Sequence, residues 1–156
     1  MALRQQTICS MLEGARWLSA VIGIQLSYYF GNSAAEQLHL LSGWLVIPIA
    51  GLSGIESLLL AETAGRLSGY GTSPYQRQSG LNNLALALTG IAVYLFNWGS
   101  TAELTILTTL LLFLFLSGCN HAWSFLREGN LAGKNMARPL LTLVLIASCL
   151  PILIKL

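Results

Sequence analysis

The chain has 156 residues, of which 54% are apolar and only 9% are charged. A soluble domain is about a quarter charged, so eight basic and six acidic side chains are too few to cover a solvated surface of this size. Intrinsic disorder is excluded by the same composition, and a formal net charge of +2 provides no basic surface for a nucleic acid. We therefore expect an all-α integral membrane protein, forming a single domain, whose partner is the lipid bilayer.

Five apolar segments predict a bundle of five transmembrane helices. In chain order they are residues 11–30, 40–60, 81–98, 104–126 and 139–154. A helix rises about 1.5 Å per residue, so about 20 residues cross a hydrocarbon core of about 30 Å. The second and fourth segments have this length. The third is close to it, and the fifth reaches it with Arg138 and Lys155 extending from its ends.

The first segment has a second interpretation, because its purely apolar part, residues 17–30, has the length of a signal peptide. We expect it to be retained as a helix. Glu13 and Arg16 are three residues apart and are predicted to pair on one face of that helix.

The loops predict the orientation of the bundle. With five spans, one side of the membrane holds the N-terminus and the loops at residues 61–80 and 127–138. Seven of the eight basic residues belong to that side, namely Arg4, Arg16, Arg66, Arg77, Arg127, Lys134 and Arg138. The positive-inside rule makes this side cytoplasmic. The sequence thus predicts a multi-pass protein of a bacterial inner (plasma) membrane, with the N-terminus in the cytoplasm and the C-terminus outside.

Small residues predict close packing between the second and third segments. Gly51, Ser53, Gly54 and Ser57 lie on one segment, and Ala85, Ala87 and Gly90 on the other. Small side chains let helix backbones approach each other in a membrane.

Polar residues from three predicted helices converge at one depth. Glu56 and His121 each precede the charged end of their helix by six residues, about 9 Å of helix rise. Asn82, Asn83 and Asn120 are expected at the same level. Because ionisable groups inside a membrane are costly and usually functional, these five residues predict a cytoplasm-facing pocket that binds or conducts a small molecule or a proton. The alternative is that they hydrogen-bond to one another and only hold the helices together.

The cytoplasmic loops are the candidate lid or docking surface for this pocket. The first loop contains Glu62, Arg66, Tyr70, Ser73, Tyr75 and Gln76, and the second contains Asn130 and Asn135. Glu62 and Arg66 are predicted to pair, since they are four residues apart on a helix. Pro74 is expected to stop helix continuation and Ser79 to cap the next helix. Lys134 and Asn135 are candidates either to point back toward His121 or to contact phospholipid head groups.

No cofactor and no metal are predicted. A haem with two histidine ligands needs both at one depth. His39 and His121 are placed at opposite ends of their helices, on the order of 20 Å apart. The three cysteines are spaced too far apart for a metal-binding pair and are expected to be small buried side chains without a disulfide.

The loop motifs resemble an uncharacterised family of small bacterial membrane proteins, domain of unknown function 6790. The resemblance covers about residues 56–139. It rests on Glu62 with Gly65-Arg66, on Ser73-Pro74-Tyr75-Gln76, on Asn83-Leu84-Ala85, on His121, and on Gly129-Asn130-Leu131-Ala132 with Asn135. It implies a multi-span membrane protein and no established activity.

Two functions follow from this reading. The first is a small-molecule or proton pocket around Glu56 and His121. The second is a non-catalytic accessory subunit of a larger membrane complex, or a homo-oligomer, because the chain is small and its predicted outer loops are short. Enzyme activity is disfavoured, since no recognised catalytic motif is present and Glu56 is nearly alone as a base.

Overall fold

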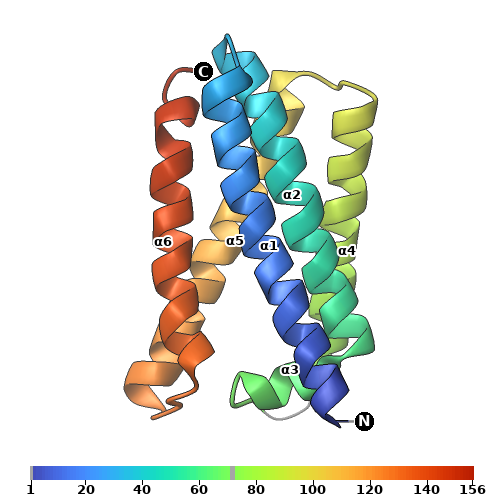
Figure 1. Cartoon of the computed structure of the whole chain (residues 1–156), viewed down its shortest axis with the longest axis vertical. Helices are drawn as coiled ribbons and strands as arrows, with labels where there is room; N and C mark the ends of the chain where they lie inside the picture. Colours follow the sequence, from blue (N-terminus) through green and yellow to red (C-terminus); the bar gives the residue numbers. More distant parts are fainter. Residues whose placement is uncertain (1, 71–72) are drawn as a thin grey trace.

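The computed structural model describes residues 2–70 and 73–156. In that part of the chain the secondary structure is entirely helical (Figure 1). The helices are α1 (Ala2–Phe30), α2 (Ala34–Leu59), α3 (Ala61–Leu67), α4 (Pro74–Leu95), α5 (Ser100–Arg127) and α6 (Gly133–Leu153).

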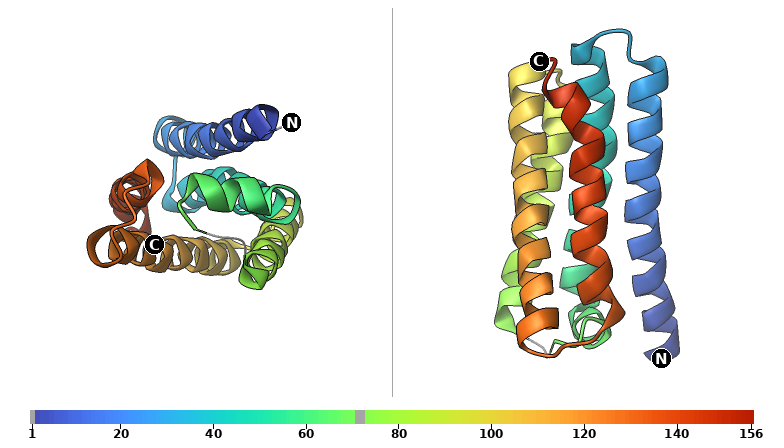
Figure 2. Two further views of the ribbon diagram at one scale, coloured as in Figure 1. Left: turned by 90° about the horizontal axis from the view of Figure 1, so that it is seen from below. Right: turned by 90° about the vertical axis from the view of Figure 1, so that its left-hand side faces the viewer.

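Five long helices run along one common direction, and the short α3 lies across one end of the bundle (Figures 1 and 2). Helix α2 is central, because it contacts each of the other five described helices. The N- and C-termini lie at opposite ends (Figure 1). The end that holds the N-terminus and α3 is called the N-terminal end below.

Each predicted transmembrane segment falls on one of the long helices, although the boundaries differ. Three described helices, α2, α5 and α6, are long and apolar enough to cross a membrane. Helix α6 is among these three, although the apolar segment predicted for it, residues 139–154, was shorter than a membrane span. Helices α1 and α4 are long enough to cross a membrane but not apolar enough, because each contains a more polar stretch next to the N-terminal end of the bundle.

The start of α4 corrects one prediction. Pro74 does not stop a helix but begins one, and Ser73 caps it by accepting a hydrogen bond from the Tyr75 amide at 3.2 Å. Proline suits the first turn of a helix because it lacks an N–H that would have no partner there. Ser79, the predicted cap, therefore lies inside the helix.

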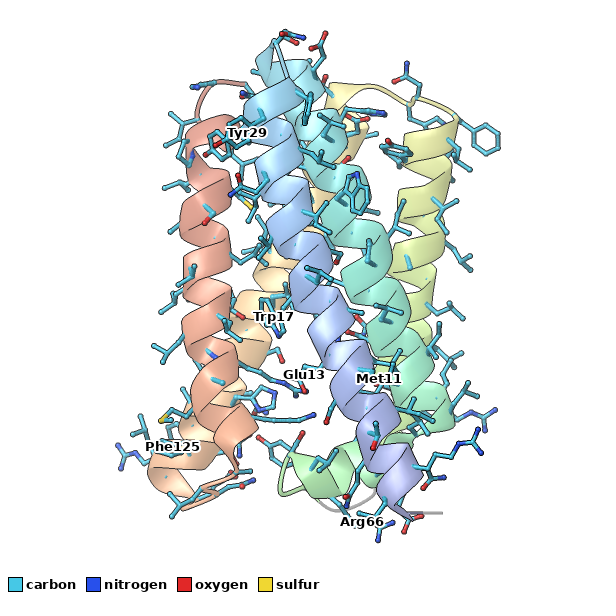
Figure 3. All side chains as sticks on the ribbon, viewed as in Figure 1. Met11, Glu13, Trp17, Tyr29, Arg66 and Phe125 are labelled. Carbon is cyan, nitrogen blue, oxygen red and sulfur yellow. The ribbon has the colours of Figure 1, made fainter. Side chains whose placement is uncertain are left out.

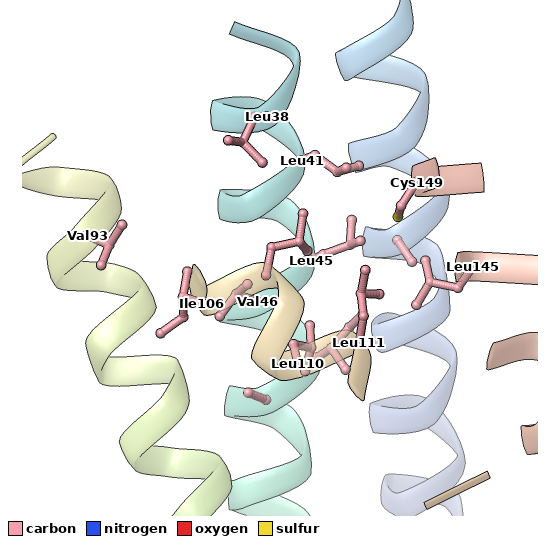
Figure 4. Close-up of a cluster of buried hydrophobic side chains, with 14 of the residues drawn as sticks. Leu38, Leu41, Leu45, Val46, Val93, Ile106, Leu110, Leu111, Leu145 and Cys149 are labelled. Atoms are coloured by element: carbon pink, nitrogen blue, oxygen red, sulfur yellow. The ribbon is translucent and has the colours of Figure 1, made fainter. Parts of the chain in front are cut away.

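The apolar core occupies the half of the bundle away from the N-terminal end (Figure 4). Its leucines and other aliphatic side chains come from all five long helices. The fully buried ones include Leu38, Leu41, Leu45, Leu107, Leu110 and Ile152. The other half of the bundle instead buries polar side chains, among them Glu56, Asn83, His121, Ser124 and Asn135. Most of the buried polar side chains thus lie toward the N-terminal end, while the buried Glu103, which pairs with His39, lies near the other end.

Close helix contacts depend on glycine, as the small-residue pattern predicted for α2 and α4. A β-carbon on Gly54 would lie 3.1 Å from the Gly80 carbonyl oxygen, and one on Gly90 would lie 2.8 Å from a methyl group of Val46. Gly23 has the same role between α1 and α2, where a β-carbon would lie 2.5 Å from that of Trp44. Glycine at these places lets the backbones approach.

Candidate functional site

A buried ion pair joins α1 to α2 in the polar half of the bundle. Arg16 donates from Nη2 to Oε2 of Glu56 at 2.6 Å and from Nη1 to Oγ of Ser53 at 2.8 Å. The side chains of Arg16 and Glu56 are only 12% and 5% exposed. Breaking such a pair would leave a charge in a poorly solvated site, so the pair fixes α1 against α2.

His121 is the centre of a second buried cluster. Its Nδ1 lies 2.7 Å from Oδ1 of Asn135, and its Nε2 lies 3.1 Å from Nη1 of Arg138. The hydroxyl of Tyr70 is 3.4 Å from the same Nδ1. Asn135 also donates to the backbone carbonyls of Ser68 and Asn130, at 3.3 and 3.1 Å. This cluster therefore joins α5 and α6 to the loop that follows α3.

These hydrogen bonds assign the proton on His121. Arginine can only donate hydrogen bonds, so the ring nitrogen facing Arg138 must be the acceptor, Nε2. The proton is then on Nδ1, where it is donated to the carbonyl oxygen of Asn135. His121 is neutral in this arrangement.

Glu13 bridges α1 and α6. Its Oε2 pairs with Nζ of Lys134 at 2.5 Å, and its Oε1 accepts from Nε of Arg138 at 3.3 Å. The predicted pairing of Glu13 with Arg16 is therefore wrong, because each of the two residues has a partner on another helix. Figure 3 places Glu13 in the half of the bundle next to α3, on the side of α1 that faces α6.

The clusters surround one cavity of about 370 Å³. All six described helices contribute to its lining, and its polar wall includes Glu13, Arg16, Glu56, Gln76, His121 and Arg138. Its other end is apolar, with Trp17, Ile49, Phe113 and Leu114. On α2 and α5 these apolar residues lie seven or eight positions away from Glu56 and His121, which is about 10 Å of helix rise. The cavity is thus polar toward α3 and apolar toward the middle of the bundle.

Most of the predicted pocket residues line this cavity, but their partners differ from those expected. Glu56, Asn83, Asn120 and His121 are all at its surface. Glu56 and His121 make no hydrogen bond to each other among the described residues: Arg16 donates to Oε2 of Glu56, and the two ring nitrogens of His121 are engaged by Asn135 and Arg138. Asn82 is a correction: it is exposed and does not line the cavity, because its neighbour Asn83 takes the inward face of α4.

The loop residues divide into two groups. Tyr70 and Gln76 reach the cavity, whereas Ser73 caps α4 and Tyr75 is 79% exposed. Glu62 and Arg66 form the predicted pair at 2.9 Å, but on the exposed surface of α3.

The second loop is held to the first by side-chain amides. Asn130 donates from Nδ2 to the Ser68 carbonyl at 3.1 Å, and it packs against Gly69, whose φ of +70° favours glycine. Asn135 points to His121 as predicted, while Lys134 pairs with Glu13 instead.

The sequence did not predict the three other charged residues of the cavity, Glu13, Arg16 and Arg138. It placed Arg138 at a helix end extending to the interface, and it paired the other two with each other. A signal was present, since each lies within or beside an apolar segment, where a charge needs a partner on another helix. Within residues 2–70 and 73–156, no three metal-ligating side chains come together.

The described chain is thus an all-helical bundle with three helices long and apolar enough to cross a membrane and a cavity lined by ion-paired side chains. It belongs to DUF6790, a family of unknown function, which it matches over residues 8–156. No curated protein and no solved structure is significantly similar to it.

Proposed function

We propose that the chain is a multi-pass protein of a bacterial inner membrane, with five spans, a cytoplasmic N-terminus and an external C-terminus. The opposite positions of the two termini in the bundle support an odd number of spans (Figure 1). The basic residues support the orientation, because seven of the eight belong to the predicted cytoplasmic segments, which meet at the N-terminal end. Helices α1 and α4 then cross the membrane with their polar stretches at the cytoplasmic interface.

The cavity is proposed to bind a small molecule that enters from the cytoplasmic side. The observation that carries this proposal is a 370 Å³ cavity bordered by the buried pair of Arg16 with Glu56 and by the half-buried pair of Arg138 with Glu13. This volume lies within the range typical of small-molecule pockets, which also combine apolar walls with a few placed polar groups. Purely structural polar contacts would be expected to fill the space between the helices.

Binding is favoured over conduction because a layer of apolar side chains separates the cavity from the buried Glu103–His39 pair near the other end of the bundle. Beyond Trp17 and Ile49, the interior is filled by the aliphatic core of Figure 4, with Leu45, Leu107 and Leu110 fully buried. Charged groups and protons need polar partners or water along their path through a membrane. A chain reconstituted in liposomes should therefore show the same proton flux as liposomes without protein.

Thiol labelling tests access to the cavity. Ser117 lines the cavity and is half-buried, whereas its neighbour Leu116 is 65% exposed on the outside of α5. In a Cys119→Ser background, Ser117→Cys should react with the hydrophilic reagent sulfonatoethyl methanethiosulfonate in inside-out vesicles. Leu116→Cys is the matched control and should stay unlabelled, because it faces lipid.

Two results would contradict the proposal. Absence of labelling at Ser117→Cys in inside-out vesicles would mean that the cavity is closed to small polar molecules. Labelling only in right-side-out vesicles would place the opening on the wrong side of the membrane.

A further inference from the structure

We infer that the ligand is an anion that also carries hydroxyl groups, the chemistry of a polyol phosphate, either free or as the head group of a lipid. This inference rests on the proposed function, because it assigns a chemical class to the ligand of the same cavity. It follows from the charge of the cluster, from its unpartnered polar atoms and from the apolar end of the cavity.

The charges at and next to the cavity do not balance, because Arg138 in its lining and Lys134 beside it share the one carboxylate of Glu13. Arg16, Lys134 and Arg138 are cationic, and they are connected by ion pairs to only two carboxylates, those of Glu13 and Glu56. His121 adds no charge, because it accepts a hydrogen bond from Arg138. The cluster therefore has an excess of one positive charge on side chains that are half-buried. A bound anion would compensate that charge.

Arg138 is the group best placed to receive the anion. Its Nε and Nη1 atoms are engaged with Glu13 and His121, whereas Nη2 donates to none of the described residues. A guanidinium has five N–H donors in a planar fork that suits the oxygens of a phosphate or carboxylate. The residue lines the cavity, so the remaining donors are available to a ligand there.

Where α2 and α4 line the cavity, two buried side-chain oxygens are hydrogen-bond acceptors without a strong donor. Oε1 of Glu56 and Oε1 of Gln76 are buried and accept no hydrogen bond from a nitrogen or oxygen donor of the described residues, and the weakly donating thiol of the buried Cys9 lies beside the Glu56 carboxylate. Glu56 as a whole is only 4% exposed. A buried acceptor left without a partner is unfavourable. Hydroxyl groups on the ligand would donate to these oxygens, and unlike an ammonium group they would add no further positive charge.

The apolar end of the cavity distinguishes two sources of this chemistry. Trp17, Phe113 and Leu114 would contact the start of an acyl chain if the ligand is a lipid. A free polyol phosphate would leave that end unused.

Binding measurements by native mass spectrometry in detergent test the inference with four probes. Phosphatidylglycerol has both the anion and the hydroxyls, phosphatidylmethanol has the anion alone, and phosphatidylcholine has neither a net charge nor a donor. Free glycerol 1-phosphate has the head group without the tail. Phosphatidylglycerol should bind about tenfold tighter than phosphatidylcholine, with phosphatidylmethanol between them. Glycerol 1-phosphate should match phosphatidylglycerol if the source is a free phosphate and bind more weakly if it is a lipid.

Variants separate the cavity from general surface attraction. Arg138→Gln should weaken phosphatidylglycerol binding about tenfold or more. The matched control is Arg127→Gln, which removes an exposed cation at the same end of the bundle and should have no effect. Ser117→Leu, which fills the cavity without removing a charge, should also weaken binding.

The inference is overturned if phosphatidylcholine and phosphatidylglycerol bind equally, or if Arg138→Gln and Arg127→Gln have equal effects. The labelling of Ser117→Cys described above is independent of these probes. Labelling from the cytoplasmic side without any preference for phosphatidylglycerol would remove the ligand assignment and leave the proposed function standing. If Ser117→Cys is not labelled from the cytoplasmic side, both the ligand assignment and the proposed function are wrong.

Discussion

The pair between Arg16 and Glu56 shows how a single contact supports the polar half of the bundle. Both side chains are almost completely buried, and Ser53 is the additional partner of the guanidinium. In a poorly solvated site, the attraction between two charges balances the cost of removing them from water only while both remain.

Replacing one member of this pair should therefore destabilise the protein. Glu56→Ala leaves the Arg16 guanidinium without its carboxylate, at a cost of about 3 kcal/mol in the free energy of unfolding. The double variant Arg16→Met with Glu56→Leu should recover most of this loss, because no charge is then left unpaired. The loss in the single variant and its recovery in the double variant are measured by unfolding the protein with SDS in mixed micelles and monitoring its circular dichroism. If the double variant is as unstable as Glu56→Ala, the ion pair is not the cause.

At the residue level the sequence predicted where polar groups gather but not how they pair. Glu56, Asn83 and His121 line one cavity, and the rise of each helix from its predicted end was enough to expect them near one another. The partners depend on the rotation of each helix about its axis. Residues near the predicted ends, Arg16 and Arg138, were therefore assigned to the interface rather than to the cavity.

At the level of the helices, α1 makes one contact with α2 that is too close to accommodate a side chain. Figure 2 shows α1 at the edge of the bundle, beside α2. Gly23 is buried against Trp44 and Leu45 of α2 in a space that leaves no room for a β-carbon.

Gly23→Ala should loosen α1 from α2. The added methyl group would meet the β-carbon of Trp44, which cannot move without its backbone, so we expect a loss of about 1–3 kcal/mol. The control is Gly14→Ala on the same helix, where a β-carbon meets nothing within 4 Å. It should leave stability unchanged or raise it by up to about 1 kcal/mol. The two variants are compared by SDS unfolding, and equal effects would contradict the packing described for α1.

The helices themselves were largely predictable, because apolar composition over sufficient length is a strong signal. The residues at which the helices begin and end were not predictable in the same way. Helix α4 begins seven residues before its predicted segment, as Ser73 and Pro74 form an N-terminal cap in a stretch read as a connector. The short α3 was missed for a similar reason, since its seven residues show no apolar periodicity.

For the whole molecule, the arrangement of termini and basic residues predicts one topology. A protease-cleavable tag at the N-terminus should be digested in inside-out vesicles and protected in right-side-out vesicles, and a C-terminal tag should show the reverse. Cleavage of both tags in the same vesicles would contradict the proposed odd number of spans.

The proposed function requires an open, charged cavity at the cytoplasmic end and a closed layer of apolar side chains beyond it. An experimental structure in lipid nanodiscs tests this most directly. It should show ordered non-protein density in contact with Glu56 and Arg138, with His121 still bonded to Asn135. A collapsed cavity, in which Glu56 and His121 contact each other and no density separates α2 from α6, would contradict it.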